Sequence, residues 1–363
     1  MTGKMWVNRF MEPYKMIYRQ EDIPQIQDNE ILIKVKACGI CGSDLVYYNG
    51  KSPLDTPDGK GPLILGHEFS GVVAEVGATP KKMGLFCEGD RVAVNPVMQC
   101  NACPACMRGE FNACTHLEVV GTMFDGAMAQ YVKAKYTHVY KIPDEVSFKS
   151  AALAEPLACA THAVDRLDVG LGQTTVVYGV GGIGLMMTQL VRAAGAGKVI
   201  VVARKDFGLK KALECGATHV INNTDPNSPY YAADVPAKVA ELNGGVLADR
   251  AILATGNMSA LQDALNVTRA CSTIVYFGQA GADDVLQVPV LATLKSEKTL
   301  KFSWLAPLVW DKVFKLIASG QVNLDPIITH EFSLEDAEKG IRFMLESKEP
   351  KVKGVILVDP DQA

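Results

Sequence analysis

The feature that most constrains the fold of this chain is a glycine-rich turn between two apolar runs. Residues 174–178 have the pattern of a buried strand, residues 185–194 contain good helix formers, and residues 198–202 form a second apolar run. A strand, a tight turn, a helix and another strand in this order predict one βαβ unit of a parallel sheet.

The turn has the spacing of a dinucleotide-binding loop. Its glycines allow a tight turn, close approach of the backbone to a pyrophosphate, and close packing of helix on strand. The unpaired N–H groups of the following helix then face the phosphates. A plain glycine-rich turn of another α/β unit is the alternative. The residues predicted to bind the cofactor here are Gly179, Gly181, Gly182, Ile183 and Gly184.

Two later apolar runs continue the same alternation. Residues 248–254 end at Thr255, and residues 272–277 end at Gly278. Ligands of such sheets bind at the carboxyl ends of the strands, so Thr255 and Gly278 are predicted to border the nicotinamide. The stretch 155–298 is therefore predicted to be a doubly wound parallel-sheet domain of the Rossmann type.

The end of the second strand predicts which dinucleotide binds. NAD sites usually place an acidic residue there to hold the ribose 2′-hydroxyl. This chain has Ala203, followed by Arg204 and Lys205. Because guanidinium and ammonium groups suit a 2′-phosphate, NADP(H) is favoured over NAD(H). Two alternatives remain: Asp206 could reach back to the ribose, or the two cations could simply be solvated.

Four of the ten cysteines lie in one loop, at Cys100, Cys103, Cys106 and Cys114. Four thiolates at this spacing predict a closed structural zinc site. A reactive or disulfide-bonded patch is one alternative. An iron–sulfur cluster is another, although the ferredoxin run closes with a shorter gap.

A second group of possible zinc ligands is spread along the chain. Cys41 follows an alternating strand pattern, His67 follows an apolar run, and Glu155 stands among apolar residues. All three residue types are legitimate zinc ligands, and a buried carboxylate needs a partner. From the residues alone the trio is only suggestive, because a lone His or Glu is more often a satisfied polar residue than a metal ligand.

Composition narrows the class of protein. The chain has 363 residues and a net charge of −4, which suggests two domains and no basic stripe for nucleic acid. No apolar run approaches the roughly 20 residues of a membrane helix, and the N-terminus has no signal-peptide pattern. A cytoplasmic protein with reduced thiols is the expectation.

Together, these motifs resemble the zinc-containing, medium-chain alcohol dehydrogenase superfamily, and most of all its polyol branch, which includes sorbitol dehydrogenase-like enzymes. The motifs, in chain order, are residues 39–44, 66–68, the four-cysteine loop, 155–157, 179–184 and the closing strand 354–358. The resemblance covers essentially the whole chain. It implies an α/β protein with a GroES-like, β-rich catalytic domain and a Rossmann domain. The expected boundaries are 1–154 and 299–363 for the catalytic domain, with its zinc lobe at about 96–115, and 155–298 for the Rossmann domain.

The resemblance also implies roles in a catalytic site. Zinc is expected on Cys41, His67 and Glu68, with Glu155 as a further ligand or as the holder of a zinc-bound water. Ser43 matches the hydroxyl that takes the substrate proton. With the cysteine loop, this makes two zinc ions per chain. Because neighbouring residues of a strand point to opposite faces, joint ligation by His67 and Glu68 requires a bend.

Tyr47 matches a tyrosine near the substrate in the polyol branch. Two positions depart from the family pattern: Val46 replaces a histidine that serves some relatives as a proton outlet, and no arginine after about residue 295 matches that of sorbitol dehydrogenases.

The expected function is zinc-dependent oxidation of a secondary alcohol or polyol to its ketone with NADP(H), in a homodimer or homotetramer that needs no nucleic acid or membrane. The first alternative is oxidation of an amino alcohol with NAD(H), as in L-threonine dehydrogenases. A zinc-bearing nucleotide sensor without turnover and an iron–sulfur electron carrier are the alternatives from other classes.

Overall fold

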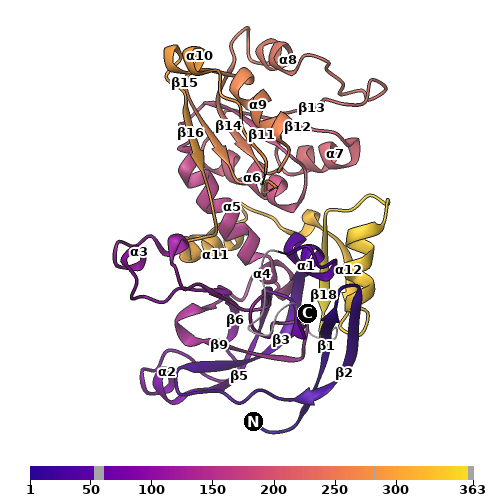
Figure 1. Cartoon of the computed structure of the whole chain (residues 1–363). Coiled ribbons are helices and arrows are strands. Elements are labelled where there is room, and N and C mark those ends of the chain that lie inside the picture. Colours follow the sequence, from indigo (N-terminus) through magenta and orange to yellow (C-terminus); the bar gives the residue numbers. More distant parts are fainter. Residues whose placement is uncertain (53–60, 282, 359–363) are drawn as a thin grey trace. The chain divides into compact units, whose positions relative to one another are not determined.

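The computed structural model describes residues 1–52, 61–281 and 283–358, and the chain divides into two units (Figure 1). Unit 1 comprises Met1–Glu155, Trp310–Ala318 and Ile328–Ala363, and unit 2 comprises Pro156–Val309 and Ser319–Ile327. Unit 1 is therefore discontinuous in sequence. Each unit is described separately.

Unit 1 is rich in antiparallel β-structure. Its main sheet runs in the order β10-β6-β5-β3-β18-β17, with β9 also paired to β3, and smaller sheets have the orders β2-β1-β4 and β7-β8. Apolar side chains from β1, β3, β5 and β6 form its core. The strands are β1 Lys4–Glu12, β2 Lys15–Asp22, β3 Glu30–Ile40, β4 Leu63–Ile64, β5 Glu68–Val76, β6 Arg91–Val94, β7 Val97–Met98, β8 Glu118–Val119, β9 Tyr131–Lys135, β10 Val139–Lys141, β17 Ile328–Ser333 and β18 Lys353–Leu357. The helices are α1 Gly42–Tyr48, α2 Ala78–Lys82, α3 Pro104–Met107, α4 Phe148–Ala152, α11 Trp310–Ala318 and α12 Ala337–Glu346.

The central strand β3 brings distant parts of the chain together. It pairs antiparallel with β5, where Gly39 lies opposite Glu68, and with β18, where Ile40 lies opposite Gly354. The last strand of the described chain thus joins the sheet formed by N-terminal residues. As a result, the starts of β5 and β18 both lie beside the end of β3, immediately before Cys41.

Unit 2 contains a parallel sheet with the order β13-β12-β11-β14-β15-β16. This is the strand order of a doubly wound dinucleotide-binding fold. The strands are β11 Thr174–Tyr178, β12 Lys198–Ala203, β13 His219–Asn222, β14 Ala248–Leu253, β15 Thr268–Tyr276 and β16 Thr299–Phe302. The helices are α5 Ala154–Leu167, which begins at the end of unit 1, α6 Gly182–Ala193, α7 Asp206–Glu214, α8 Val235–Leu242, α9 Met258–Val267 and α10 Val290–Lys295.

The boundaries of unit 2 extend beyond 155–298, the range expected from the sequence. Strand β16 belongs to unit 2 because it pairs in parallel with β15. Residues 319–327 belong to it as well. There, the Gln189 side chain donates to the backbone oxygen of Asn323 at 2.8 Å and accepts from its backbone nitrogen at 2.7 Å.

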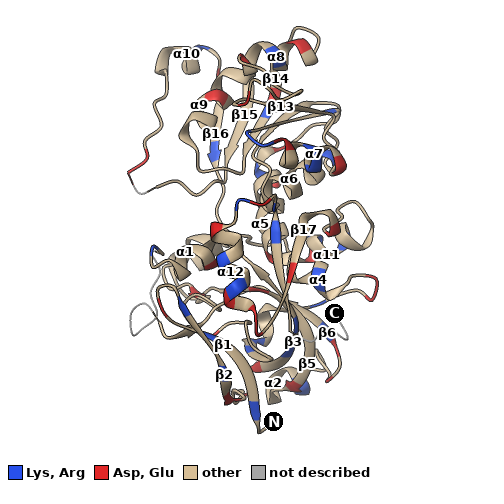
Figure 2. Cartoon of the chain, turned by 90° about the vertical axis from the view of Figure 1, so that its right-hand side faces the viewer, with Lys and Arg blue, Asp and Glu red and all other residues tan. Residues whose placement is uncertain are grey.

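Charged residues of both signs are distributed over the described chain (Figure 2). Lys and Arg are interspersed with Asp and Glu along the ribbon of both units (Figure 2). None of the described helices has the length and apolar character needed to cross a membrane.

The glycine turn after β11 has strict steric limits. Gly179 has φ +105°, a conformation that favours glycine. A Cβ added at Gly184, in the first turn of α6, would lie 2.1 Å from the backbone oxygen of Gly179. A Cβ at Gly181, the N-cap of α6, would meet nothing within 4 Å. The third glycine of the motif is thus required by packing of the protein itself, whereas the second leaves open space.

We expect Gly184→Ala to destabilise the protein by about 1–3 kcal/mol, because the methyl group forces α6 away from the turn after β11. Gly181→Ala is the matched control and should leave the melting temperature unchanged. Thermal unfolding followed by circular dichroism measures both. Equal melting temperatures for the two variants would contradict the steric assignment.

Candidate functional site

Three potential metal ligands meet in unit 1. Cys41 is the N-cap of α1, His67 precedes β5, and Glu68 is the first residue of β5. One ligand atom from each lies within 4.8 Å of the other two, and His67 and Glu68 are buried. Gly66, with φ +95°, supplies a bend just before them, and a Cβ there would lie 2.6 Å from the Cys38 sulfur.

The imidazole of His67 lies between two groups contributed by α1. Asp44 Oδ2 accepts a hydrogen bond from the Cys41 backbone at 2.8 Å, and Asp44 Oδ1 lies 3.6 Å from His67 Nδ1. On the other side, Ser43 Oγ lies 3.3 Å from His67 Nε2. Burial opposes a charge on the ring, but Asp44 and Cys41 outweigh it and raise the pKa of His67 well above its ordinary value.

Glu68 is paired with a lysine from the other end of the chain. Lys353 Nζ lies 2.7 Å from Oε1 and 2.6 Å from Oε2 of Glu68, and both side chains are buried. Burial lowers the pKa of Lys353, but the Glu68 carboxylate more than compensates, so the pKa is raised. A Cβ at Gly39 would lie 2.2 Å from Glu68 Oε2, so the strand beside this pair must carry glycine.

Sequence reasoning did not single out Lys353 or assign a role to Asp44. The only signal for Lys353 was a lysine at the start of an apolar strand, and its partner lies 285 positions away. For Asp44 the signal was local, because it stands three residues after the helix N-cap, where acidic side chains bind the cap backbone.

Two other residues predicted for the catalytic site, Glu155 and Tyr47, lie outside this group of ligand atoms. Glu155 is half-buried in the first turn of α5, and it is not part of the group of ligand atoms formed by Cys41, His67 and Glu68. Tyr47 is only 1% exposed and belongs to the apolar core, where its ring packs edge-to-face on Phe10 at 5.2 Å.

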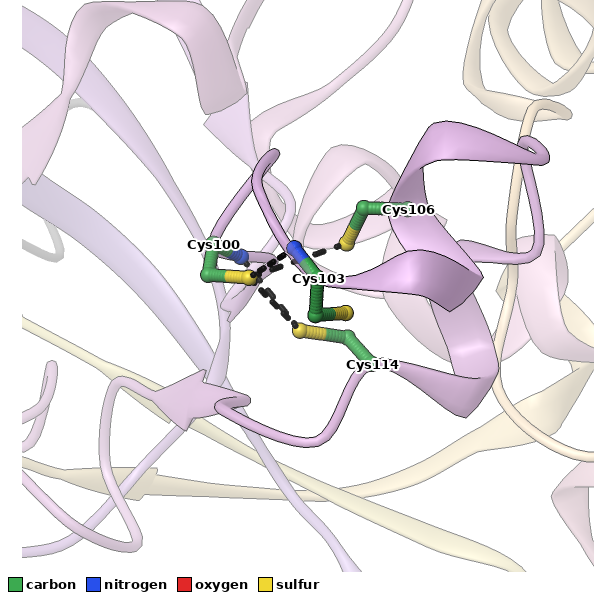
Figure 3. A group of neighbouring side chains, drawn as sticks. All are labelled: Cys100, Cys103, Cys106 and Cys114. Carbon is green, nitrogen blue, oxygen red and sulfur yellow. Dashed lines mark hydrogen bonds between the residues drawn. The ribbon is translucent and has the colours of Figure 1, made fainter.

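The four cysteines of the 100–114 loop gather around one point (Figure 3). The sulfur of Cys100 lies 3.9 Å from that of Cys106 and 3.5 Å from that of Cys114, and all four thiols are free of disulfides. Four sulfurs at about 2.3 Å from one zinc ion lie about 3.8 Å from each other. The spacing therefore fits a tetrahedral zinc site.

Backbone amides point at the cysteine sulfurs. The N–H groups of Ala102 and Cys103 donate to Cys100 Sγ at 3.4 and 3.3 Å. Amides of Cys106 and Thr115 lower the pKa of Cys103 to about 5, whereas burial raises the pKa of Cys106 to about 12. Such amides stabilise thiolates, the form that binds metal.

The predicted cofactor residues of unit 2 lie at the carboxyl ends of its strands. Gly179 follows β11, Thr255 follows β14 and Gly278 follows β15. A Cβ at Gly278 would lie 1.9 Å from the backbone oxygen of Thr255, so these two strand ends are in close backbone contact. The structure thus brings Thr255 and Gly278 together.

The end of β12 carries two exposed cations. Ala203 ends the strand, and Arg204 and Lys205 are exposed. Among the described residues, neither forms a salt bridge. Asp206, the first residue of α7, instead accepts hydrogen bonds from Asn222 and Ser228.

The chain matches two protein-family models that together cover most of its length. Residues 27–144 match the alcohol dehydrogenase GroES-like domain, and residues 182–319 match the zinc-binding dehydrogenase family. The chain is also 34% identical to sorbitol dehydrogenase of Bacillus subtilis (strain 168), over 94% of this chain and 93% of that protein.

This chain therefore belongs to the zinc-binding dehydrogenases of the medium-chain alcohol dehydrogenase superfamily, and it is polyol dehydrogenase-like. It is an oxidoreductase of alcohols or polyols. The predicted family and the predicted α/β fold, GroES-like plus Rossmann, are both confirmed.

Solved structures share the fold but differ in cofactor. A zinc-binding dehydrogenase from Sinorhizobium meliloti 1021 bound to NADP has a TM-score of 0.87 and 28% identity, covering 98% of this chain and 100% of that one. The short chain alcohol dehydrogenase rspB of E. coli CFT073, complexed with NADH, also has a TM-score of 0.87 and 28% identity, covering 98% and 99%. These neighbours support a nicotinamide cofactor but favour neither form.

We expect Cys103→Ser to remove one zinc ion per chain and to lower the melting temperature, because a closed zinc site contributes folding free energy. Cys87→Ser, at an exposed cysteine outside both groups, is the matched control and should change neither quantity. Metal analysis and thermal unfolding test this. Unchanged zinc content in Cys103→Ser would rule out the lobe as a zinc site.

We expect Lys353→Met to lower the free energy of unfolding by about 3–5 kcal/mol, because it leaves the buried Glu68 charge unpaired. Adding Glu68→Gln should recover part of this loss. Lys238→Met, which breaks an exposed pair with Glu241, is the control and should cost less than about 1 kcal/mol. Urea unfolding measures these variants and Glu68→Gln alone, and strictly additive effects of the Lys353 and Glu68 changes would refute the coupling.

Proposed function

We propose that this chain is a zinc-dependent dehydrogenase that oxidises a secondary alcohol or polyol to the ketone or ketose with NADP(H) as cofactor. The observation that carries the proposal is the group of Cys41, His67 and Glu68, with Ser43 and Asp44 placed around the imidazole. Thiolate, imidazole and carboxylate are the ligand types of catalytic zinc. The donor set therefore fits the metal that the family implies.

The residues around the His67 imidazole have different roles in holding the metal. Asp44 faces Nδ1 of His67 and so holds the ring with Nε2 as the ligand nitrogen. Cys41 supplies the second ligand. Lys353 already pairs with both oxygens of Glu68, so Glu68 would share its carboxylate between Lys353 and the metal. Glu155 is assigned either as a further ligand or as the holder of a zinc-bound water.

A zinc ion bound here would supply Lewis acidity, which lowers the pKa of an alcohol held beside it. Ser43 then receives the hydroxyl proton, since its Oγ lies next to the ligand nitrogen of His67. With Val46 in place of a histidine outlet, the proton leaves Ser43 toward water, the cofactor ribose or Glu155. The glycine loop after β11 would hold the pyrophosphate of the cofactor, and the strand ends at Thr255 and Gly278 would border its nicotinamide, which would supply the hydride acceptor.

The second metal is assigned a structural role. The sulfur spacing and the inward amides of the 100–114 loop support a closed, four-thiolate zinc site that leaves no position for substrate. Two zinc ions per chain are therefore proposed.

The ten free cysteines support a reducing compartment such as the cytoplasm.

The positive charges at the end of β12 support NADP(H) as the cofactor. Arg204 and Lys205 are exposed and make no salt bridge within the described chain, so both can pair with a 2′-phosphate. Asp206, the acidic residue nearest to this position, has one carboxylate oxygen, Oδ1, bonded to Asn222 and Ser228. The similarity to sorbitol dehydrogenase supports a polyol as the substrate.

The test is a substrate screen on the full-length enzyme after its zinc content has been measured. Polyols, simple secondary alcohols and L-threonine are each assayed with NADP⁺ and with NAD⁺. We expect the highest kcat/KM for a polyol with NADP⁺, and nearly complete loss of turnover with loss of one zinc in Cys41→Ser.

Cys271→Ser, at an exposed cysteine, is the control and should keep both zinc ions and full turnover. A clear preference for NAD⁺ would refute the cofactor assignment, and a preference for L-threonine would refute the substrate class. Normal zinc content and turnover in Cys41→Ser would refute the catalytic site.

A further inference from the structure

A small hydrogen-bond network fixes the acidic residue beside the predicted ribose position. Asp206 Oδ1 accepts from Asn222 Nδ2 at 2.7 Å and from Ser228 Oγ at 2.7 Å. These two bonds from Ser228 and Asn222 favour the charged form and lower the pKa of Asp206. Both donors come from the segment at and after the end of β13, the strand that pairs with β12.

Asn222 is the centre of this network. It is 1% exposed, and its position in β13 lies opposite Ala203 at the end of β12. Its side-chain oxygen accepts from the backbone N–H groups of Thr224 and Asp225 at 3.0 Å each. Because the oxygen of this amide is engaged, its donor nitrogen is held in place, where it donates to Asp206 at 2.7 Å and to the backbone oxygen of Arg204 at 3.4 Å.

The same segment holds the backbone of the turn after β12. Thr224 Oγ1 donates to the backbone oxygen of Arg204 at 3.3 Å. Arg204 and Asp206 are thus both tied to the end of β13, one through its backbone and one through its carboxylate. The Arg204 side chain remains exposed and outside this network.

We propose that Asn222 and Ser228 are positioning residues for cofactor selectivity, because they hold the Asp206 carboxylate against the β13 segment and so leave the ribose 2′ position to Arg204 and Lys205. This inference rests on the proposed use of NADP(H). A carboxylate free to turn toward the ribose would accept its hydroxyls and repel a 2′-phosphate. By holding the Asp206 carboxylate, the network keeps it from competing with the 2′-phosphate, although the acidic residue is still present.

The test is calorimetric binding of two adenine nucleotides, 2′,5′-ADP and 5′-AMP, to the full-length, zinc-loaded protein. The variants are Ser228→Ala, Asp206→Asn and the combination of both, with Ser296→Ala at the C-cap of α10 as the matched serine control. We expect Ser228→Ala to reduce the preference for 2′,5′-ADP over 5′-AMP by about fivefold. In the Asp206→Asn background, the same change should have no effect, and Ser296→Ala should have none in either.

A merely structural role for Ser228 would change binding equally in both backgrounds, and that result would overturn the inference, as would no change in either. Asn222→Ala, alone and with Asp206→Asn, repeats the comparison through the second donor. Equal affinity of the unaltered protein for both nucleotides would instead refute the proposed cofactor. The coupling between positions 228 and 206 is measured independently of that result.

Discussion

The candidate catalytic site depends on one buried ion pair, between Lys353 and Glu68. A buried carboxylate is costly unless a partner compensates its charge, and here the partner comes from the last strand of the described chain. The pair can form only because β3 places β5 and β18 on either side of it. Gly39 provides the space for the carboxylate, so the geometry beside His67 and Cys41 depends on the complete sheet.

The two candidate metal sites differ in how far apart their residues lie in sequence. The four cysteines lie within one loop of fifteen residues, and the backbone amides of that same loop orient their sulfurs. Local geometry is sufficient to form such a site. By contrast, Cys41 and His67 approach each other only through pairing of β3 with β5. The four-cysteine loop, formed by local geometry, suits a structural role. The Cys41–His67 group forms only when the whole sheet of unit 1 is folded, which suits a catalytic role.

Much of the geometry of the glycine turn was predictable, because its requirements are steric and local. Gly179 needs a positive φ, and Gly184 has no room for a side chain. The alternation of apolar runs similarly predicted the doubly wound sheet. The orientation of Asp206 was not predictable, since its partners Asn222 and Ser228 follow a different strand. The sequence also predicted that the residues of strand β16 belong to the catalytic domain, because the sequence of a short strand does not indicate which sheet it joins.

The sequence by itself determined the chemistry available: four clustered thiols, a glycine loop between strand and helix, and a set of residues typical of zinc-dependent dehydrogenases. Only the tertiary structure decided which of the dispersed carboxylates stand together. It placed Glu68 beside Cys41 and His67 and left Glu155 outside that group. It also paired Glu68 with Lys353. The physical reason is that local patterns report steric and apolar requirements within a few residues, whereas the pairing of buried charges is set by the register of strands far apart in the chain.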